Sequence, residues 1–130
     1  MAVSLSQSQS LSQSNMKIMI FGHERLDVYR LSIEYVAMVY SFADRLAGKY
    51  RHAKDQWLRA CQSIPLNIAE GNGKVNAADR RKYFDIARGS ALECAAVQDV
   101  LEVGKAIDNE ENNNGKQMLD RIVAMLTKLK

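Results

Sequence analysis

The sequence predicts an all-α protein folded as an antiparallel, up-and-down four-helix bundle, and three observations support this. Apolar residues recur at spacings of three and four through most of the chain, which is the period of a helix with one buried face. Valine, isoleucine and threonine rarely cluster, so strands are disfavoured. The 130 residues include one proline and seven glycines, and four of these glycines fall between the apolar-periodic segments. Four helices with short connections therefore form a single domain.

Residues 1–20 are predicted to be a disordered tail, and residues 21–130 the bundle domain. Residues 1–15 alternate serine and glutamine and carry no charge, so they bury too little apolar surface to offset the entropy of ordering. Three methionines, Met1, Met16 and Met19, are candidates for the native start.

The first two helices are expected over residues 24–47 and 55–70, joined by a basic loop. Gly48 ends the first helix, and Gly71 and Gly73 supply left-handed conformations that end the second. Pro65 removes a backbone hydrogen bond, so we expect a kink within a continuous second helix. The two apolar stripes comprise Leu26, Tyr29, Ile33, Val36, Tyr40 and Ala43, and Trp57, Cys61, Ile64 and Ile68.

The last two helices are expected over residues 77–107 and 116–129, with residues 108–115 as their connection. Asn76 is a good N-cap for the first of them, and Asp79 places a negative charge near its positive end. The two stripes comprise Phe84, Ala87, Ala91, Cys94, Val97, Leu101 and Gly104, and Leu119, Ile122, Leu126 and Leu129.

Charge is distributed unevenly along the chain, although the net charge is only +3. Ten basic residues oppose four acidic ones between Arg45 and Arg88, an excess of six, whereas Lys105 alone opposes six acidic residues between Glu93 and Glu111. This pattern fits a solvated surface, a basic face for an anionic partner, or complementary surfaces between subunits. The basic residues expected to contact nucleic acid are Arg51, Lys54, Arg80, Arg81 and Lys82.

The residue patterns of common catalytic and metal sites are absent from the sequence. Neither His23 nor His52 has the glutamate three residues earlier that a di-iron bundle requires, and the sequence around Gly73 and Lys74 lacks the first glycine and the hydroxyl residue of a phosphate loop. Cys61 and Cys94 lie in apolar stripes, where thiolate formation is disfavoured. We therefore expect no enzymatic activity, no metal and no cofactor.

Localisation follows from similar absences. No apolar run is long enough to span a bilayer, and the N-terminus lacks a signal peptide. Two cysteines at apolar positions are typical of free thiols in a reducing compartment. The sequence predicts a cytoplasmic protein without a membrane partner.

Polar residues flank or interrupt the apolar stripes of the second and third helices. Asn67 and Glu70 are three residues apart and share a helix face, where buried polar groups require partners. We expect a polar network that fixes helix register or a subunit contact; a ligand or nucleic-acid site is the alternative. The candidate partners are Arg59, Arg88 and Ser90, and Glu93 lies beside them.

Two segments, "RACQSIPLNIAEGNGK" and "YFDIARGSALE", resemble the bacterial family of 23S rRNA intervening-sequence proteins. The resemblance covers residues 24–130, and the motif positions expected to be structural are Arg59, Ser63, Pro65, Asn67, Glu70, Gly71, Arg88, Ser90 and Glu93. It implies an up-and-down bundle that assembles as a homopentameric ring, without an established enzymatic activity. A more distant likeness is to the accessory variability proteins of diversity-generating retroelements.

The function that these observations favour is a homo-oligomeric, non-enzymatic bundle that binds RNA or a ribonucleoprotein through its basic residues. A ring repeats a modest basic patch several times and so converts weak phosphate contacts into avidity. The alternative is a scaffold that binds other proteins without contacting nucleic acid, in which the charge polarity serves subunit contacts.

Overall fold

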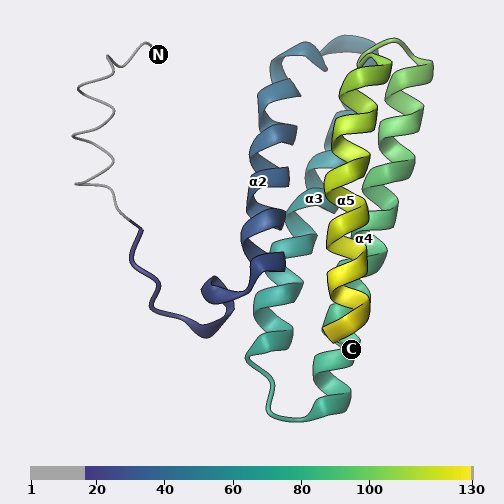
Figure 1. Ribbon diagram of the computed structural model, residues 1–130. Helices are drawn as coiled ribbons and strands as arrows, with labels where there is room; N and C mark the ends of the chain where they lie inside the picture. Colours follow the sequence, from purple (N-terminus) through teal and green to yellow (C-terminus); the bar gives the residue numbers. More distant parts are fainter. Residues whose placement is uncertain (1–16, 130) are drawn as a thin grey trace, which may run out of the picture.

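The computed structural model describes residues 17–129 and confirms the predicted all-α bundle. Four α-helices run up and down in turn: α2 (Asp27–Phe42), α3 (Arg51–Asn72), α4 (Ala77–Val103) and α5 (Asn109–Leu129) (Figure 1). Helix α2 packs on α3 and α5, and α4 packs on the same two helices, so α2 and α4 lie diagonally across the bundle. The predicted tail lies outside the described residues up to residue 16, and residues 17–20 are not helical.

The apolar faces of α3, α4 and α5 are largely those that the sequence predicts. All four predicted residues of α3 are buried, as are six of the seven predicted for α4. The exceptions are Gly104, which is the exposed C-cap residue of α4, and Leu129, which is exposed at the end of α5.

The predicted face of α2 is wrong. The residues buried in α2 are Val28, Leu31, Ser32, Tyr35 and Val39, whereas the predicted stripe flanks them and remains partly or fully exposed. Two apolar stripes overlap on this helix. The stripe that faces the core carries Tyr35, whose hydroxyl group finds hydrogen-bonding partners there, as a buried hydroxyl must.

A chain of buried hydrogen bonds takes one side chain from each helix. The indole N–H of Trp57 in α3 donates to the hydroxyl oxygen of Tyr35 in α2 at 2.9 Å, and that hydroxyl donates to Oε1 of Gln98 in α4. Gln98 Nε2 in turn donates to the backbone carbonyl and to Oδ1 of Asn112 in α5, at 3.1 and 2.9 Å. We call Tyr35, Trp57, Gln98 and Asn112 the core tetrad. Since each member needs the others, the tetrad fixes the register of all four helices.

Sequence reasoning missed the core tetrad. Gln98 lies between Val97 and Leu101 in the apolar stripe of α4, and a lone amide in such a stripe is the signal that could have identified it. Asn112 lies in an asparagine-rich segment that is typical of a loop, and this composition concealed its burial.

The expected connection at residues 108–115 is also wrong, because α5 begins at Asn109. Asp108 and Glu111 form a reciprocal cap: the backbone N–H of Glu111 donates to Asp108 Oδ1 at 2.8 Å, and that of Asp108 donates to Glu111 Oε1 at 2.9 Å. Arg45 adds hydrogen bonds to both oxygens of Glu111, at 2.8 and 3.0 Å. The connection is therefore short, and the polar segment forms the first two turns of α5.

Other boundaries differ by a few residues. The first helix ends at Phe42, followed by a 3₁₀ turn at Ala43–Arg45, and α4 ends at Val103. The expected basic loop is a 3₁₀ turn at Gly48–Tyr50 followed by the start of α3. Gly48 has a φ of 66°, but it does not end the first helix as predicted, because α2 already ends at Phe42.

Gly71 and Gly73 do not adopt the left-handed conformation that the sequence predicts. Gly73 has a φ of −82°, and Gly71 lies inside α3. A Cβ atom at Gly71 would lie 2.9 Å from Cε1 of Phe84, so the glycine allows α3 and α4 to approach each other closely. Helix α3 continues through the buried Pro65, as expected, and Asn76 caps α4 by accepting from the backbone N–H groups of Ala78 and Asp79.

Candidate nucleic-acid interface

The structure divides the five predicted nucleic-acid-binding residues between opposite ends of the bundle. Arg51 and Lys54 lie in the first turn of α3, and Arg80, Arg81 and Lys82 lie near the start of α4. The two helices are antiparallel, so the length of α3 beyond Lys54, about 27 Å, separates the two groups. Figure 1 shows that α3 and α4 start at opposite ends of the bundle, so the five residues do not form one continuous patch.

The group at the start of α4 is well exposed, and we call Lys74, Arg80, Arg81 and Lys82 the α4 basic cluster. Lys82 and the two arginines are exposed, and Lys74 is partly exposed. The ammonium groups of Lys74 and Lys82 lie 5.3 and 5.8 Å from the ring centroid of Tyr83, which holds both side chains at this end. Lys74 also forms an ion pair with Glu70 at 3.3 Å, and this contact raises the pKa of Lys74.

The group at the start of α3 has acidic surroundings. The hydroxyl of Tyr50 donates to the backbone carbonyl of Gly104 at 2.9 Å, so the start of α3 lies beside the end of α4. Exposed or partly exposed acidic residues gather there, namely Glu102, Asp108, Glu110 and Glu111. These carboxylates weaken the attraction of a polyanion to Arg51 and Lys54. The α4 basic cluster also has acidic neighbours, Glu70 and Asp79, but it holds three consecutive exposed cations and is the stronger candidate for phosphate contacts.

The family-like motif forms a smaller polar network than the sequence predicts. Asn67 Nδ2 donates to the carbonyl and to the hydroxyl oxygen of Ser63, at 2.8 and 2.9 Å, and the hydroxyl of Ser90 in α4 donates to the same hydroxyl oxygen at 2.8 Å. This Ser63–Asn67–Ser90 network joins α3 to α4.

The remaining polar motif residues lie outside this network. Glu70 faces solvent and pairs with Lys74, and Arg88 donates through Nε to the hydroxyl of Thr127 in α5 at 3.0 Å. Arg59 and Glu93 are exposed. The prediction that Glu70, Arg88 and Arg59 belong to a buried polar network is therefore wrong. These side chains lie at the surface and do not need buried partners.

The chemistry available inside the bundle is limited by burial. Burial raises the pKa of the Cys61 thiol to about 12 and also raises that of Cys94, so both remain protonated at neutral pH. Burial likewise raises the pKa of Tyr35. Within residues 17–129, no group of three or more histidine, cysteine, aspartate or glutamate side chains is placed to hold a metal ion. No helix in this part of the chain is long and apolar enough to cross a membrane.

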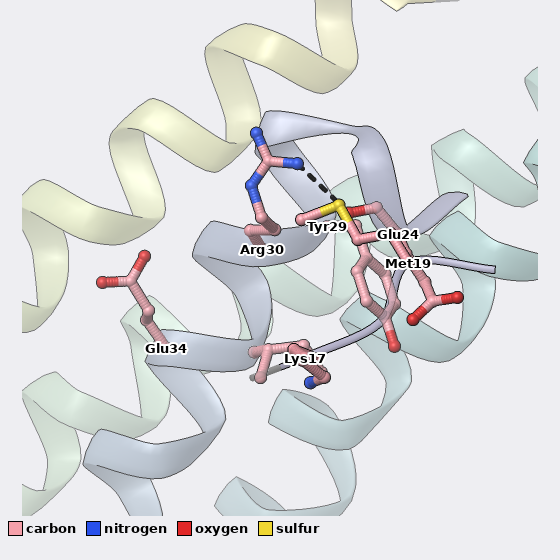
Figure 2. Close-up of a pocket in the computed structure, with 7 residues that line it drawn as sticks. Lys17, Met19, Glu24, Tyr29, Arg30 and Glu34 are labelled. Atoms are coloured by element: carbon pink, nitrogen blue, oxygen red, sulfur yellow. Dashed lines mark hydrogen bonds between the residues drawn. The ribbon is translucent and has the colours of Figure 1, made fainter. Parts of the chain in front are cut away.

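A pocket of about 270 Å³ lies between the segment before α2 and α2 itself (Figure 2). Lys17, Met19 and Glu24 line it from the segment before the helix, and Tyr29, Arg30 and Glu34 line it from α2. Arg30 donates to the backbone carbonyl of Glu24 at 3.1 Å and pairs with Asp27, so its guanidinium group is already bound within the chain. We assign no ligand to this pocket.

The fold and its surface define a class: four-helix-bundle proteins with a polar core network and charged ends. Residues 24–128 match the sequence profile of the 23S rRNA-intervening sequence protein family. This match spans most of the chain, and the protein belongs to that family, which confirms the predicted resemblance.

Among the solved structures that are similar to this chain, one comes from Bacteroides thetaiotaomicron. It is described as a protein with unknown function from the S23 ribosomal protein family. It superposes with a TM-score of 0.73 at 22% sequence identity, covering 78% of this chain and 96% of that chain. At this identity the similarity concerns the fold alone. No curated protein matches the chain.

Proposed function

We propose that this protein is a non-enzymatic, cytoplasmic, homo-oligomeric bundle that binds RNA or a ribonucleoprotein through the α4 basic cluster. The observation that carries the proposal is the placement of Arg80, Arg81 and Lys82 together on exposed surface near the start of α4. Guanidinium and ammonium groups of this kind contact phosphate oxygens without reading sequence. The family description, which refers to 23S rRNA, supports RNA as the polyanion.

Assembly strengthens the proposal. Three or four cations per chain give weak binding to phosphates, but several copies linked in one particle contact a single RNA at the same time. The family resemblance favours five copies in a ring. Sedimentation-velocity centrifugation and native mass spectrometry count the copies, and a single-chain mass of 14.6 kDa at micromolar concentration would contradict this part of the proposal.

The test is a binding titration with a fluorescein-labelled 23S rRNA hairpin across a series of salt concentrations. The variant Arg80→Ala/Arg81→Ala/Lys82→Ala removes three cations. The matched control, Arg51→Ala/Lys54→Ala/Lys49→Ala, removes three cations at the opposite end of the bundle. We expect the first variant to reduce the steepness of log affinity against log salt by about 2 to 3 for each copy bound. Each phosphate that is no longer contacted keeps about one counterion on the RNA, so fewer ions are released on binding.

Three outcomes would count against RNA binding: no binding at low salt, affinity that does not depend on salt, or equal effects of the two triple variants.

The rival function is a protein scaffold, since the acidic end of the bundle could equally contact a basic partner. Affinity purification from cell extract, with and without ribonuclease, separates the two. Partners lost with RNA support the proposal, and partners that survive ribonuclease support the scaffold.

A further inference from the structure

The residues just before the first turn form an apolar surface that the bundle does not cover. We call residues 17–21 the arm; it precedes the 3₁₀ turn Gly22–Arg25 and extends from the side of α2 (Figure 1). Its four apolar side chains are exposed: Ile18 by 74%, Met19 by 40%, Ile20 by 70% and Phe21 by 63%. Four consecutive large apolar residues in contact with water are unfavourable unless another surface covers them.

The backbone of the arm is held in a defined position. Glu24 Oε1 accepts hydrogen bonds from the backbone N–H groups of Ile20 and Phe21, at 3.0 and 2.6 Å. Arg25 donates to the carbonyl of Met19 at 3.5 Å, and the Phe21 ring stacks on His23 with 5.9 Å between their centroids. The arm thus presents its apolar side chains from an anchored backbone, which reduces the entropy lost on docking.

A second uncovered apolar surface runs along the outer side of α4. We call it the α4 face: Gly89, Leu92, Ala96, Val100 and Val103, spaced three or four residues apart and all exposed. Val100 is 62% exposed and Val103 83%. Beside Leu92, an open groove of about 330 Å³ between α4 and α5 is lined by Ala91, Ala95, Leu119 and Val123, with Lys116 and Asp120 at its margin.

Gly89 is unusual because nothing within residues 17–129 explains why this position is a glycine. A glycine within a helix costs about 1 kcal/mol relative to alanine. A Cβ atom at this position would meet no heavy atom within 4 Å, so no neighbouring helix of the bundle requires the glycine. Close approach of another chain to this side of α4 would require a glycine at position 89.

The arm and the α4 face lie on opposite sides of one molecule. The arm precedes α2, and α2 and α4 are diagonal in the bundle (Figure 1). The arm also lies near the end of α3, since a Cβ atom at Gly22 would be 3.3 Å from Nδ2 of Asn72, whereas Val103 lies at the other end of the bundle. The two surfaces of one chain therefore cannot cover each other.

Charge makes the two surfaces complementary. The arm and its adjoining turn carry the exposed cations Lys17 and Arg25 and the partly exposed carboxylate of Glu24, so their net charge is +1. The α4 face is flanked by Glu93, Asp99 and Glu102, and Asp99 pairs with Lys116 at 2.5 Å. A basic apolar arm fits an acidic apolar face, and rim charges of opposite sign favour and orient such a contact.

We propose that the arm of one copy packs against the α4 face of a neighbouring copy. This contact joins two different surfaces, so repeating it produces a closed ring when the rotation between copies permits. The inference rests on the homo-oligomer of the proposed function and specifies the contact that builds it. The arm precedes residue 24, where the family match begins, so the contact is a property of this chain beyond the matched region.

The first experiment measures the number of copies in full-length protein by light scattering and sedimentation. The arm variant is Ile20→Ser/Phe21→Ser, the face variant is Val100→Ser/Val103→Ser, and the control is Val75→Ser, which changes an apolar residue that is 97% exposed elsewhere. We expect the arm and face variants to fall to the single-chain mass with unchanged circular dichroism. The control should retain the wild-type number of copies.

The second experiment exchanges charge. Lys17→Glu/Arg25→Glu makes the arm acidic. Glu93→Lys/Asp99→Asn adds one cation beside the α4 face, removes two carboxylates and frees Lys116 from its ion pair, so Glu102 is the one flanking carboxylate left and the face becomes basic. We expect each pair alone to weaken self-association at least tenfold, and the four changes in one chain to restore it, because the two surfaces are again opposite in sign. Failure of the combined variant to assemble would overturn the contact.

A third measurement identifies what covers the arm. A photo-crosslinker at position 21, in a mixture of unlabelled and ¹⁵N-labelled protein, should yield crosslinks between copies that map to residues 89–103. Crosslinks within one chain, to its own first sixteen residues or to α2, would overturn the inference. A wild-type protein that is monomeric would overturn both the oligomeric part of the proposed function and the inference, whereas an oligomer unaffected by both apolar variants would overturn the inference alone.

Discussion

Substituting alanine for glycine should have opposite effects at two helical positions. In an exposed helix, this change stabilises the folded state by about 0.5 to 1 kcal/mol, because alanine loses less backbone entropy on folding. Gly89 meets this condition, since a Cβ atom there would meet no heavy atom within 4 Å in the part of the chain that the structure describes. Gly115 does not, because its Cβ atom would lie 2.6 Å from both Nε2 and Oε1 of Gln98.

The magnitude at Gly115 follows from the core tetrad. Gln98 is fully buried and bonds to Tyr35 and Asn112, so it cannot move aside without breaking at least one of these hydrogen bonds. A buried polar group left without a partner costs about 1 to 3 kcal/mol, and the gain in helix propensity offsets about 1 kcal/mol of this. We expect Gly115→Ala to lower the free energy of unfolding by up to about 2 kcal/mol.

The assay is urea unfolding followed by circular dichroism, repeated at several protein concentrations so that self-association is recognised by its concentration dependence. We expect the two alanine variants to differ in their free energy of unfolding by about 0.5 to 3 kcal/mol. A Gly115→Ala protein stabilised as much as an open helical site would be, by about 0.5 to 1 kcal/mol, would refute the packing of Gln98 against Gly115. Destabilisation by Gly89→Ala at high protein concentration alone would instead reflect the contact between copies.

Three further predictions concern single side chains. Arg45 and a backbone hydrogen bond lower the pKa of Glu111 to about 2. The contribution of Glu111 to stability is therefore present above about pH 4.5 and is lost as the pH falls toward 2. Glu111→Gln should reduce the dependence of the free energy of unfolding on pH across this range. Cys61 and Cys94 should react with a thiol reagent at pH 8 at least a hundredfold more slowly in the folded than in the urea-unfolded protein, and equal rates would contradict their burial. Asn76→Ala should lower the free energy of unfolding by about 1 kcal/mol through loss of the cap, whereas Asn76→Gly should cost only a few tenths.

Much of the fold could be predicted from the sequence, because helical period is a local property. The face of α3 was correct since Trp57, Cys61, Ile64 and Ile68 form a single stripe. The face of α2 was wrong because two apolar stripes overlap there, and the choice between them depends on partners of Tyr35 in other helices. Local pattern carries no information about such partners.

The ends of the helices and the basic surface depend still more on tertiary contacts. Residues 109–115 have the composition of a loop, yet the cap at Asp108 and the burial of Asn112 against Gln98 make them helical. Basic residues counted along the chain suggested one surface, but the antiparallel order of α3 and α4 places Lys54 and Arg80 at opposite ends. Proximity in sequence was therefore a poor guide to proximity in space.

The core tetrad has a practical consequence for spectroscopy. Trp57 is the single tryptophan of the chain, and its indole group is the first donor in a series of hydrogen bonds that reaches every helix. Its fluorescence emission therefore reports on the fit between helices, while far-UV circular dichroism reports on the helices themselves. A variant that keeps the dichroism but shifts the emission to the red has retained its helices and loosened its interior, so two simple measurements separate these states without isotopic labelling.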